Sequence, residues 1–285
     1  MATFTNQATL TYRNSVVNSN VVAGEILETL AVNKNALAPT YDAAGNVVYV
    51  VNISNSGATA LSNLTLTDDL GAYEFGAGTL TPLTYVDGTL NYFVDGVLQP
   101  APAVADQSPL TVTGISLPAG ATGTLVYQTE VNGFAPLVPG STITNTATFS
   151  GGGLADTASD TATVSVNQAP RLDITKAVTP ATVGPNDRIT YTFNVLNYGN
   201  TATVATDDVV ITDTFDPVLS DIVVSYNGVT WTAGTEYTYN STTGEFSTVA
   251  GAVTVPAATY TQDAVTGEWV ITPGQITLTV TGAIS

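Results

Sequence analysis

The chain contains only two lysines, and both stand in strand-like segments beside apolar residues. Lys34 is in phase with Leu30 and Val32, and Lys176 holds the same place in a similar segment. Because side chains alternate between the two faces of a strand, each lysine should point inward with its apolar neighbours. A buried ammonium group is costly, so each lysine should either pair with an acid or lose its proton.

Aspartate and asparagine residues with the same inward phase could supply that chemistry. Asp68 and Asp213 each end an apolar segment, Asn145 lies among apolar residues in mid-chain, and Asn6 lies near the N-terminus. A desolvated lysine is a nucleophile, and a desolvated aspartic acid can polarise an amide carbonyl. Attack of a lysine amine on an asparagine side chain releases ammonia and leaves an isopeptide cross-link.

Two triads are therefore expected, one within a domain and one between molecules. The alternative is an unreacted ion pair with the asparagine hydrogen-bonded beside it, which would fix strand register. Strand alternation predicts direction but not distance, so both interpretations stay open. The expected triads are Lys34, Asp68 and Asn145 within the first domain, and Lys176, Asp213 and Asn6 across two molecules.

The elements that position these residues are predicted to be β-strands. The chain has 285 residues, of which 44% are hydrophobic, and period-2 alternation recurs along it. Two copies of one pattern are visible: Asn55-Ser56-Gly57 matches Asn197-Tyr198-Gly199, at the same spacing as Lys34 and Lys176. The fold class is therefore predicted to be all-β, with two tandem Ig-like β-sandwich domains.

The repeat divides the chain into three parts, which are a hairpin, a complete sandwich and an incomplete sandwich. Residues 1–22 form an N-terminal donor hairpin, residues 23–166 a complete sandwich, and residues 167–285 a second sandwich. The segment 141–166 closes the first sandwich, and the second has no counterpart of it. Residues 23–28 are expected to be a connector, and residues 209–213 a strand that matches residues 64–68.

The N-terminal hairpin is expected to bind to the incomplete second sandwich. A sandwich without its terminal strands leaves an open edge and an apolar groove, which an extended segment of another chain can fill. Donor and acceptor lie at opposite ends, so the contact is head-to-tail between copies of this chain. A closed monomer, in which the hairpin folds into its own second domain, is the alternative. The expected donor residues are Phe4, Asn6, Ala8, Leu10 and Tyr12.

Composition excludes several classes of function. The net charge is −18, with five basic residues, no histidine and no cysteine. Such a charge disfavours nucleic-acid partners, and the missing residue types remove the usual bases, nucleophiles and metal ligands. We expect no cofactor, no metal, no membrane insertion and no enzyme activity beyond the autocatalytic cross-link. No signal peptide is visible, so either the sequence is that of a processed chain or the protein reaches a cell or spore surface by another route.

Three segments resemble a known family. They are the run Asp-Arg-Ile-Thr-Tyr-Thr-Phe-Asn-Val-Leu-Asn-Tyr-Gly at residues 187–199, Ile-Thr-Asp-Thr at 211–214, and Thr-Asn-Thr-Ala-Thr at 144–148. They resemble the bacterial and archaeal surface repeats called domain of unknown function eleven. The resemblance covers both cores and implies Ig-like sandwiches in extracellular, cell-surface proteins. The second core departs from the family because its closing strands are missing.

Two functions follow as expectations. The first is a structural subunit of a pilus-like surface filament, joined by the N-terminal hairpin and locked by isopeptide bonds. The second is a surface adhesin or stalk module that binds a glycan or a host protein.

Overall fold

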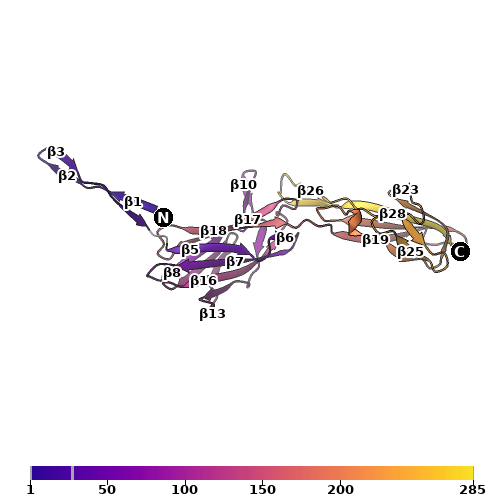
Figure 1. Cartoon of the computed structure of the whole chain (residues 1–285), viewed down its shortest axis with the longest axis horizontal. Coiled ribbons are helices and arrows are strands. Elements are labelled where there is room, and N and C mark those ends of the chain that lie inside the picture. The colour runs from indigo at the N-terminus through magenta and orange to yellow at the C-terminus, as the bar shows by residue number, and fades with distance from the viewer. Residues whose placement is uncertain (1, 27–28, 285) are drawn as a thin grey trace. The chain divides into compact units, whose positions relative to one another are not determined.

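The computed structural model describes residues 2–26 and 29–284. In these ranges the elements are strands, apart from one 3-10 turn, η1 (Ala205–Asp207). No helix among them could cross a membrane. The chain divides into two compact units, Met1–Pro136 with Thr142–Ser165, and Leu137–Ser141 with Val166–Ser285. The predicted all-β class is confirmed, and Figure 1 shows the strands of each unit.

The N-terminal segment forms a long hairpin of four short strands. β2 (Thr9–Tyr12) pairs with β3 (Ser15–Asn18), and β1 (Ala2–Asn6) pairs with β4 (Val22–Ile26). Arg13 and Asn14 turn the chain with positive φ angles of 42° and 64°. The prediction that residues 23–28 form a connector was wrong at 23–26, since β4 pairs back along β1. Residues 27–28 lie outside the described part.

The first unit is a sandwich of two six-stranded sheets around a continuous apolar core. One sheet has the order β13-β12-β16-β7-β5, with β11 also on β16, and the other has the order β14-β15-β8-β17-β18-β6. β9 (Tyr73–Phe75) and β10 (Gly78–Leu80) form a separate pair. The strands of the first sheet are β5 (Leu30–Ala36), β7 (Asn46–Asn55), β11 (Leu83–Tyr85), β12 (Asn91–Val94), β13 (Val97–Gln99) and β16 (Thr122–Val131). Those of the second are β6 (Thr40–Tyr41), β8 (Leu61–Asp68), β14 (Ala103–Gln107), β15 (Leu110–Leu117), β17 (Thr142–Gly151) and β18 (Ala158–Val166).

The second unit has a first sheet of five strands and a second sheet of only three among the described residues. The orders are β19-β20-β28-β22-β23 and β21-β25-β24, with β26 paired to β27 beside them. The larger sheet contains β19 (Leu172–Thr179), β20 (Arg188–Asn197), β22 (Leu219–Tyr226), β23 (Val229–Thr230) and β28 (Gly274–Ile284). The others are β21 (Thr212–Thr214), β24 (Tyr237–Tyr239), β25 (Glu245–Thr248), β26 (Thr259–Gln262) and β27 (Trp269–Thr272).

Strand register shows that the two units are copies of one pattern. Lys34 lies opposite Val51 in the β5–β7 pair, and Lys176 lies opposite Phe193 in the β19–β20 pair. Both differences, 176 minus 34 and 193 minus 51, equal 142. The copies also share a buried asparagine that accepts a hydrogen bond from the glycine two residues later. The first sheet was therefore duplicated together with its edge strand.

The copies differ at the second sheet. In the first unit β8 lies between β15 and β17, whereas in the second unit β21 has β25 on one side only. No described strand takes the places of β17 and β18 there. The expected strand over residues 209–213 is shorter in the structure, since β21 begins at Thr212. Residues 209–211 lack the ladder partner that β17 gives to the matching part of β8.

Candidate functional site

The first candidate site lies between the two sheets of the first unit. Lys34 reaches inward from the edge strand β5, and Asp68 reaches it from the end of β8 in the facing sheet. Their Nζ and Oδ2 atoms are 2.6 Å apart, and both side chains are fully buried. The Tyr127 hydroxyl donates to the same Oδ2, and the Leu70 amide donates to Oδ1 at 3.0 Å. The carboxyl group is therefore held in one orientation.

Burial sets the electrostatics of this site. It lowers the pKa of Lys34, although the Asp68 carboxylate, followed by Asp69 and Asp160, opposes that shift. The Lys34 Nζ also lies 4.6 Å from the centre of the Tyr49 ring. A lowered lysine pKa increases the fraction of neutral amine near neutral pH, which is the nucleophilic form.

Asn145 is the third member of the predicted triad. It is fully buried on β17, and neither atom of its amide has a hydrogen-bond partner among the described residues. Register places Ala147 opposite Asp68, so Asn145 is the next residue on the same face of β17. An unpaired buried amide costs about 1–3 kcal/mol. The structure thus buries this amide two residues from the position opposite Asp68 and gives it no hydrogen-bond partner among the described residues.

Two tyrosines and one aspartate near this site were missed from the sequence. Burial raises the pKa of Tyr127 and of Tyr49, and the Tyr49 hydroxyl borders Asn145 without a hydrogen bond of good geometry. The Asp160 carboxylate accepts a hydrogen bond of 2.7 Å from the Lys34 backbone amide. Tyr49 alternates in phase with buried valines of β7, and that signal could have identified it.

The second candidate site has the same lysine and aspartate in a more open setting. Lys176 on β19 forms an ion pair with Asp213 on β21, and 42% of the lysine side chain is exposed. Its Nζ lies 4.6 Å from the centre of the Tyr191 ring and 5.6 Å from those of Phe193 and Phe215. The aromatic faces stabilise the cation and hold it beside the carboxylate.

The asparagine predicted for this second triad lies in the other unit. Asn6 is on β1 of the hairpin, where its side chain is exposed. A single chain therefore brings together Lys176 and Asp213, and the encounter with Asn6 stays a prediction. Among the other predicted donor residues, Phe4, Ala8, Leu10 and Tyr12 are likewise exposed.

An open apolar groove accompanies the second pair. Every residue of β19 is exposed, and Leu172 and Ile174 are 40% and 50% exposed, although their phase points inward. The matching Leu30 in the first unit is 3% exposed. A cavity of about 230 Å³ lies here. Its lining consists of Leu172, Asp173, Ile174, Val195, Val209, Val210 and Ile211.

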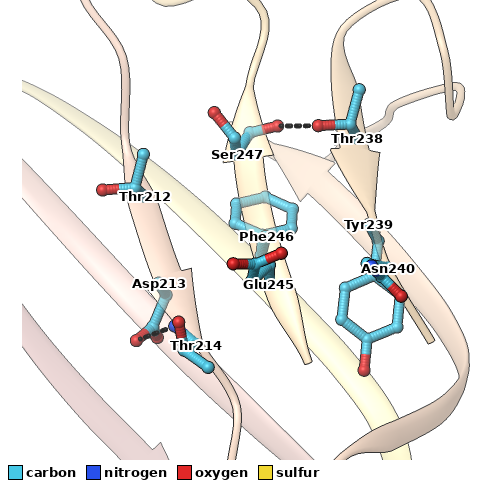
Figure 2. Close-up of a pocket in the computed structure, with 9 residues that line it drawn as sticks. All are labelled: Thr212, Asp213, Thr214, Thr238, Tyr239, Asn240, Glu245, Phe246 and Ser247. Carbon is cyan, nitrogen blue, oxygen red and sulfur yellow. Dashed lines mark hydrogen bonds between the residues drawn. The ribbon is translucent and has the colours of Figure 1, made fainter. Parts of the chain in front are cut away.

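A second hollow lies over the reduced sheet. It has a volume of about 550 Å³ and is lined by β21, β24 and β25. Figure 2 shows Asp213 on β21, with Phe246 and Tyr239 on the neighbouring strands. Asp213, whose side chain is 17% exposed, thus lines this hollow beside the buried Phe246.

Comparisons with known proteins give a fold resemblance only. No family model and no curated protein matches the sequence. The structure is similar to a variant of the major pilin subunit BcpA of Bacillus cereus, at a TM-score of 0.39 and 12% identity, over 95% of this chain and 73% of that one. It is also similar to the pilus backbone protein RrgB of Streptococcus pneumoniae (TM-score 0.34, 10% identity, 86% of this chain and 55% of that one).

A third similar structure is the collagen adhesin of S. aureus. Its TM-score is 0.31 at 14% identity, and the match covers 55% of this chain and 54% of that one. The chain spans about half the length of this adhesin and of RrgB. All three scores are below 0.5, and they carry no argument about function.

Proposed function

We propose that this chain is a structural subunit of a surface filament. The N-terminal hairpin of one molecule inserts into the open groove of the second unit of the next, and repetition gives a head-to-tail polymer. The observation that carries the proposal is that one part of the chain is short of strands and another part has strands to spare. Among the described residues, the second unit has no counterpart of the strand pair that closes the first, and residues 4–23 of the hairpin are all exposed.

The energetic reason for insertion is the apolar surface on both sides of the joint. The hairpin exposes Leu10 by 63%, Val17 by 51% and Tyr12 by 57% on one face, and the groove exposes Leu172 and Ile174. Burying one such side chain contributes about 1.5–3 kcal/mol. The free edge of β21 also gains main-chain hydrogen bonds from an added strand.

A second copy of the chain is the occupant that this proposal requires. The hairpin ends at Ile26 and β5 begins at Leu30, so a tether of at most about 14 Å holds the hairpin to the first unit. Head-to-tail insertion uses a different surface on each partner, and every added molecule presents the same two surfaces again.

Covalent locking is the second part of the proposal. The neutral amine of a lysine attacks Cγ of the asparagine, so that an Nζ–Cγ bond forms and the Cγ–Nδ2 bond breaks. The aspartic acid donates a hydrogen bond to the carbonyl oxygen and passes the lysine proton to the leaving nitrogen, which departs as ammonia. Lys34 and Asn145 form this bond within the first unit, and Lys176 and Asn6 form it at each joint.

Two substitutions on one strand test the insertion. Leu10→Asp places a charge on the face that enters the groove, and Thr11→Asp places the same charge on the opposite face of β2. Both side chains are exposed in the free molecule. Electron microscopy should show filaments for Thr11→Asp and none for Leu10→Asp. Filaments formed by a variant that lacks residues 1–26 would overturn the proposal.

The locking step has its own test. Filaments of the unmodified chain should give ladders that survive boiling in detergent, whereas Lys176→Ala or Asn6→Ala should give monomers after boiling. A Lys176→Ala variant that keeps the ladder would remove the covalent part and leave insertion standing.

A further inference from the structure

The free hairpin already has the strand pairing of the segment that closes the first unit. Asn6 lies opposite Val22 in the β1–β4 pair, and Asn145 lies opposite Ala162 in the β17–β18 pair. The residues around the two asparagines also agree, since Thr-Asn-Gln-Ala-Thr at 5–9 matches Thr-Asn-Thr-Ala-Thr at 144–148. Residue 6 thus corresponds to 145, and each later residue of the strand follows in step.

The first unit shows how such a strand sits on its neighbour. β17 lies against β8 with Ala147 opposite Asp68, Thr148 opposite Thr67 and Phe149 opposite Leu66. The partner strand in the second unit corresponds at a constant spacing, because Asp68 matches Asp213 in both sequence and ion pairing. Positions 67 and 66 therefore correspond to 212 and 211.

We propose, resting on the proposed function, that the joint between molecules has one defined register. Ala8 of the inserted hairpin lies opposite Asp213 of the neighbour, Thr9 opposite Thr212, and Leu10 opposite Ile211. Residues 209–211 gain the ladder partner that they lack in the single chain, and β21 lengthens toward Val209.

This register explains how the groove is filled. Leu10 takes the place of Phe149, which is fully buried in the first unit. It enters the cavity of about 230 Å³ that Val209 and Ile211 line. Val17 lies opposite Leu10 in the β2–β3 pair and shares its face, so it is carried in with it.

The same register brings the Asn6 side chain to the residues with which it is proposed to react. Asn6 is two residues before Ala8, so its amide comes to the Lys176–Asp213 pair from the inward face, as Asn145 does at Lys34. A slip of one residue turns Asn6 to the opposite face. A slip of two residues moves it roughly 7 Å along the strand. The cross-link can therefore form in one register only.

A bulge in the free hairpin lies beside Ala8. Gln7 and Ala8 stand between the pairs that end at Asn6 and Thr9, and three residues, 19–21, face them. The Ser19 amide donates to the Ala8 carbonyl at 2.8 Å, and the Ala8 amide donates to the Ser19 hydroxyl at 2.9 Å. The extra residue keeps Val17 and Val22 on the face shared by Leu10 and Asn6. The hairpin is thus shaped for the groove before it binds.

Paired cysteines read the register directly, since the chain has no cysteine of its own. Thr9→Cys with Thr212→Cys places two thiols opposite each other, with Cα atoms about 5.5 Å apart, which a disulfide can span. The control is Thr11→Cys with Thr212→Cys, which is displaced by two residues on the same face. Its Cα atoms are about 7–8 Å apart, too far for a disulfide.

The measurement uses filaments assembled under reducing conditions, treated with a thiol oxidant, denatured and labelled for free thiols. The Thr9/Thr212 variant should lose most of its label, and the Thr11/Thr212 control should keep it. A reversed pattern, or full labelling of both in filaments visible by electron microscopy, overturns the register and leaves the proposed function standing. If the unmodified chain forms no filaments, both fall.

A second measurement needs no substitution. Hydrogen exchange of the Val210 and Thr212 amides should slow by at least tenfold in filaments relative to unassembled protein. These two amides point to the open edge, because the intervening Ile211 bonds to Thr248 on the β25 side. Filaments in which these amides exchange as before would overturn the register.

Discussion

The two units contain the same lysine-aspartate pair, and they differ in what covers it. Lys34 and Asp68 are fully buried beneath β17 and β18, whereas 42% of the Lys176 side chain is exposed. The strands that carry the lysines, β5 and β19, have equivalent partners and register. Both sites contain a lysine and an aspartate, so the identity of these residues does not decide whether the lysine is buried. The comparison teaches that the closing strands, β17 and β18, decide it.

The sites differ also in what holds the carboxyl group. Tyr127 of β16 pairs with Tyr49 and donates to Asp68, while Val280 of β28 pairs with Tyr191 at the matching position. Asp213 therefore has no counterpart of the Tyr127 hydroxyl. The buried site holds its acid by several donors, whereas the open site holds its lysine among aromatic rings until a strand arrives.

The largest effect on assembly and stability is expected when a hairpin copy fused after Ser285 fills the groove of the second unit. A copy of residues 2–26 joined to Ser285 by a flexible Gly-Ser linker should fill the groove, stop polymerisation and raise the melting temperature. Size-exclusion chromatography and thermal unfolding measure both outcomes. In the matched control the appended copy carries Leu10→Asp, which cannot fill an apolar groove, so that this fusion should still polymerise. Equal polymerisation by both fusions would contradict the comparison.

The next effect concerns the cross-link of the closed unit. Intact-mass spectrometry of the unmodified chain should show the loss of one ammonia from the first unit, and Asn145→Ala should show none. Loss of a link that closes a loop of about 100 residues should lower the free energy of unfolding by ~4–5 kcal/mol, by analogy with a disulfide. An unmodified chain with its full calculated mass would indicate the unreacted ion pair.

A smaller effect on the free energy of unfolding should distinguish Tyr127 from Tyr49, two buried tyrosines of the first unit. In an Asn145→Ala background, Tyr127→Phe removes a donor from Asp68 and should lower the free energy of unfolding by about 1.5–3 kcal/mol. Tyr49→Phe is the matched control, because its buried hydroxyl has no hydrogen-bond partner among the described residues and its loss should cost little. Urea unfolding of both variants gives the comparison. Equal losses would show that the Tyr127 hydroxyl does not anchor the acid.

Strand alternation was enough to place Lys34, Asp68 and Asn145 in the core, because a strand with one buried face has only one allowed phase. The contact from Tyr127 depends on the separation of two sheets, which alternation does not encode. The same limit applies to Asp160, which meets Lys34 from an adjacent sheet edge.

Two boundaries were wrong for a different reason. The pair Ala23-Gly24 has poor strand propensity, yet β4 continues through it because the Phe4 ring lies across Gly24. Residues 209–211 have a good strand pattern, but among the described strands none lies on the side where β17 pairs with β8, and only Ile211 bonds to Thr248 on the other side. In both cases the extent of the strand was set by the residues that lie across from it, which the local sequence does not specify.

The smallest expected effect is a pH dependence of the stability of the closed site. Burial lowers the pKa of Lys34 in the folded state, so the folded chain binds fewer protons there than the unfolded chain between that pKa and about 10.4. Stability of the Asn145→Ala variant should therefore rise with pH through this window. Above about pH 10 it should fall, because the buried Tyr127 keeps its proton while an unfolded tyrosine loses it. Lys34→Met in the same background should remove the rise and keep the fall, and an unchanged rise would assign it to another group.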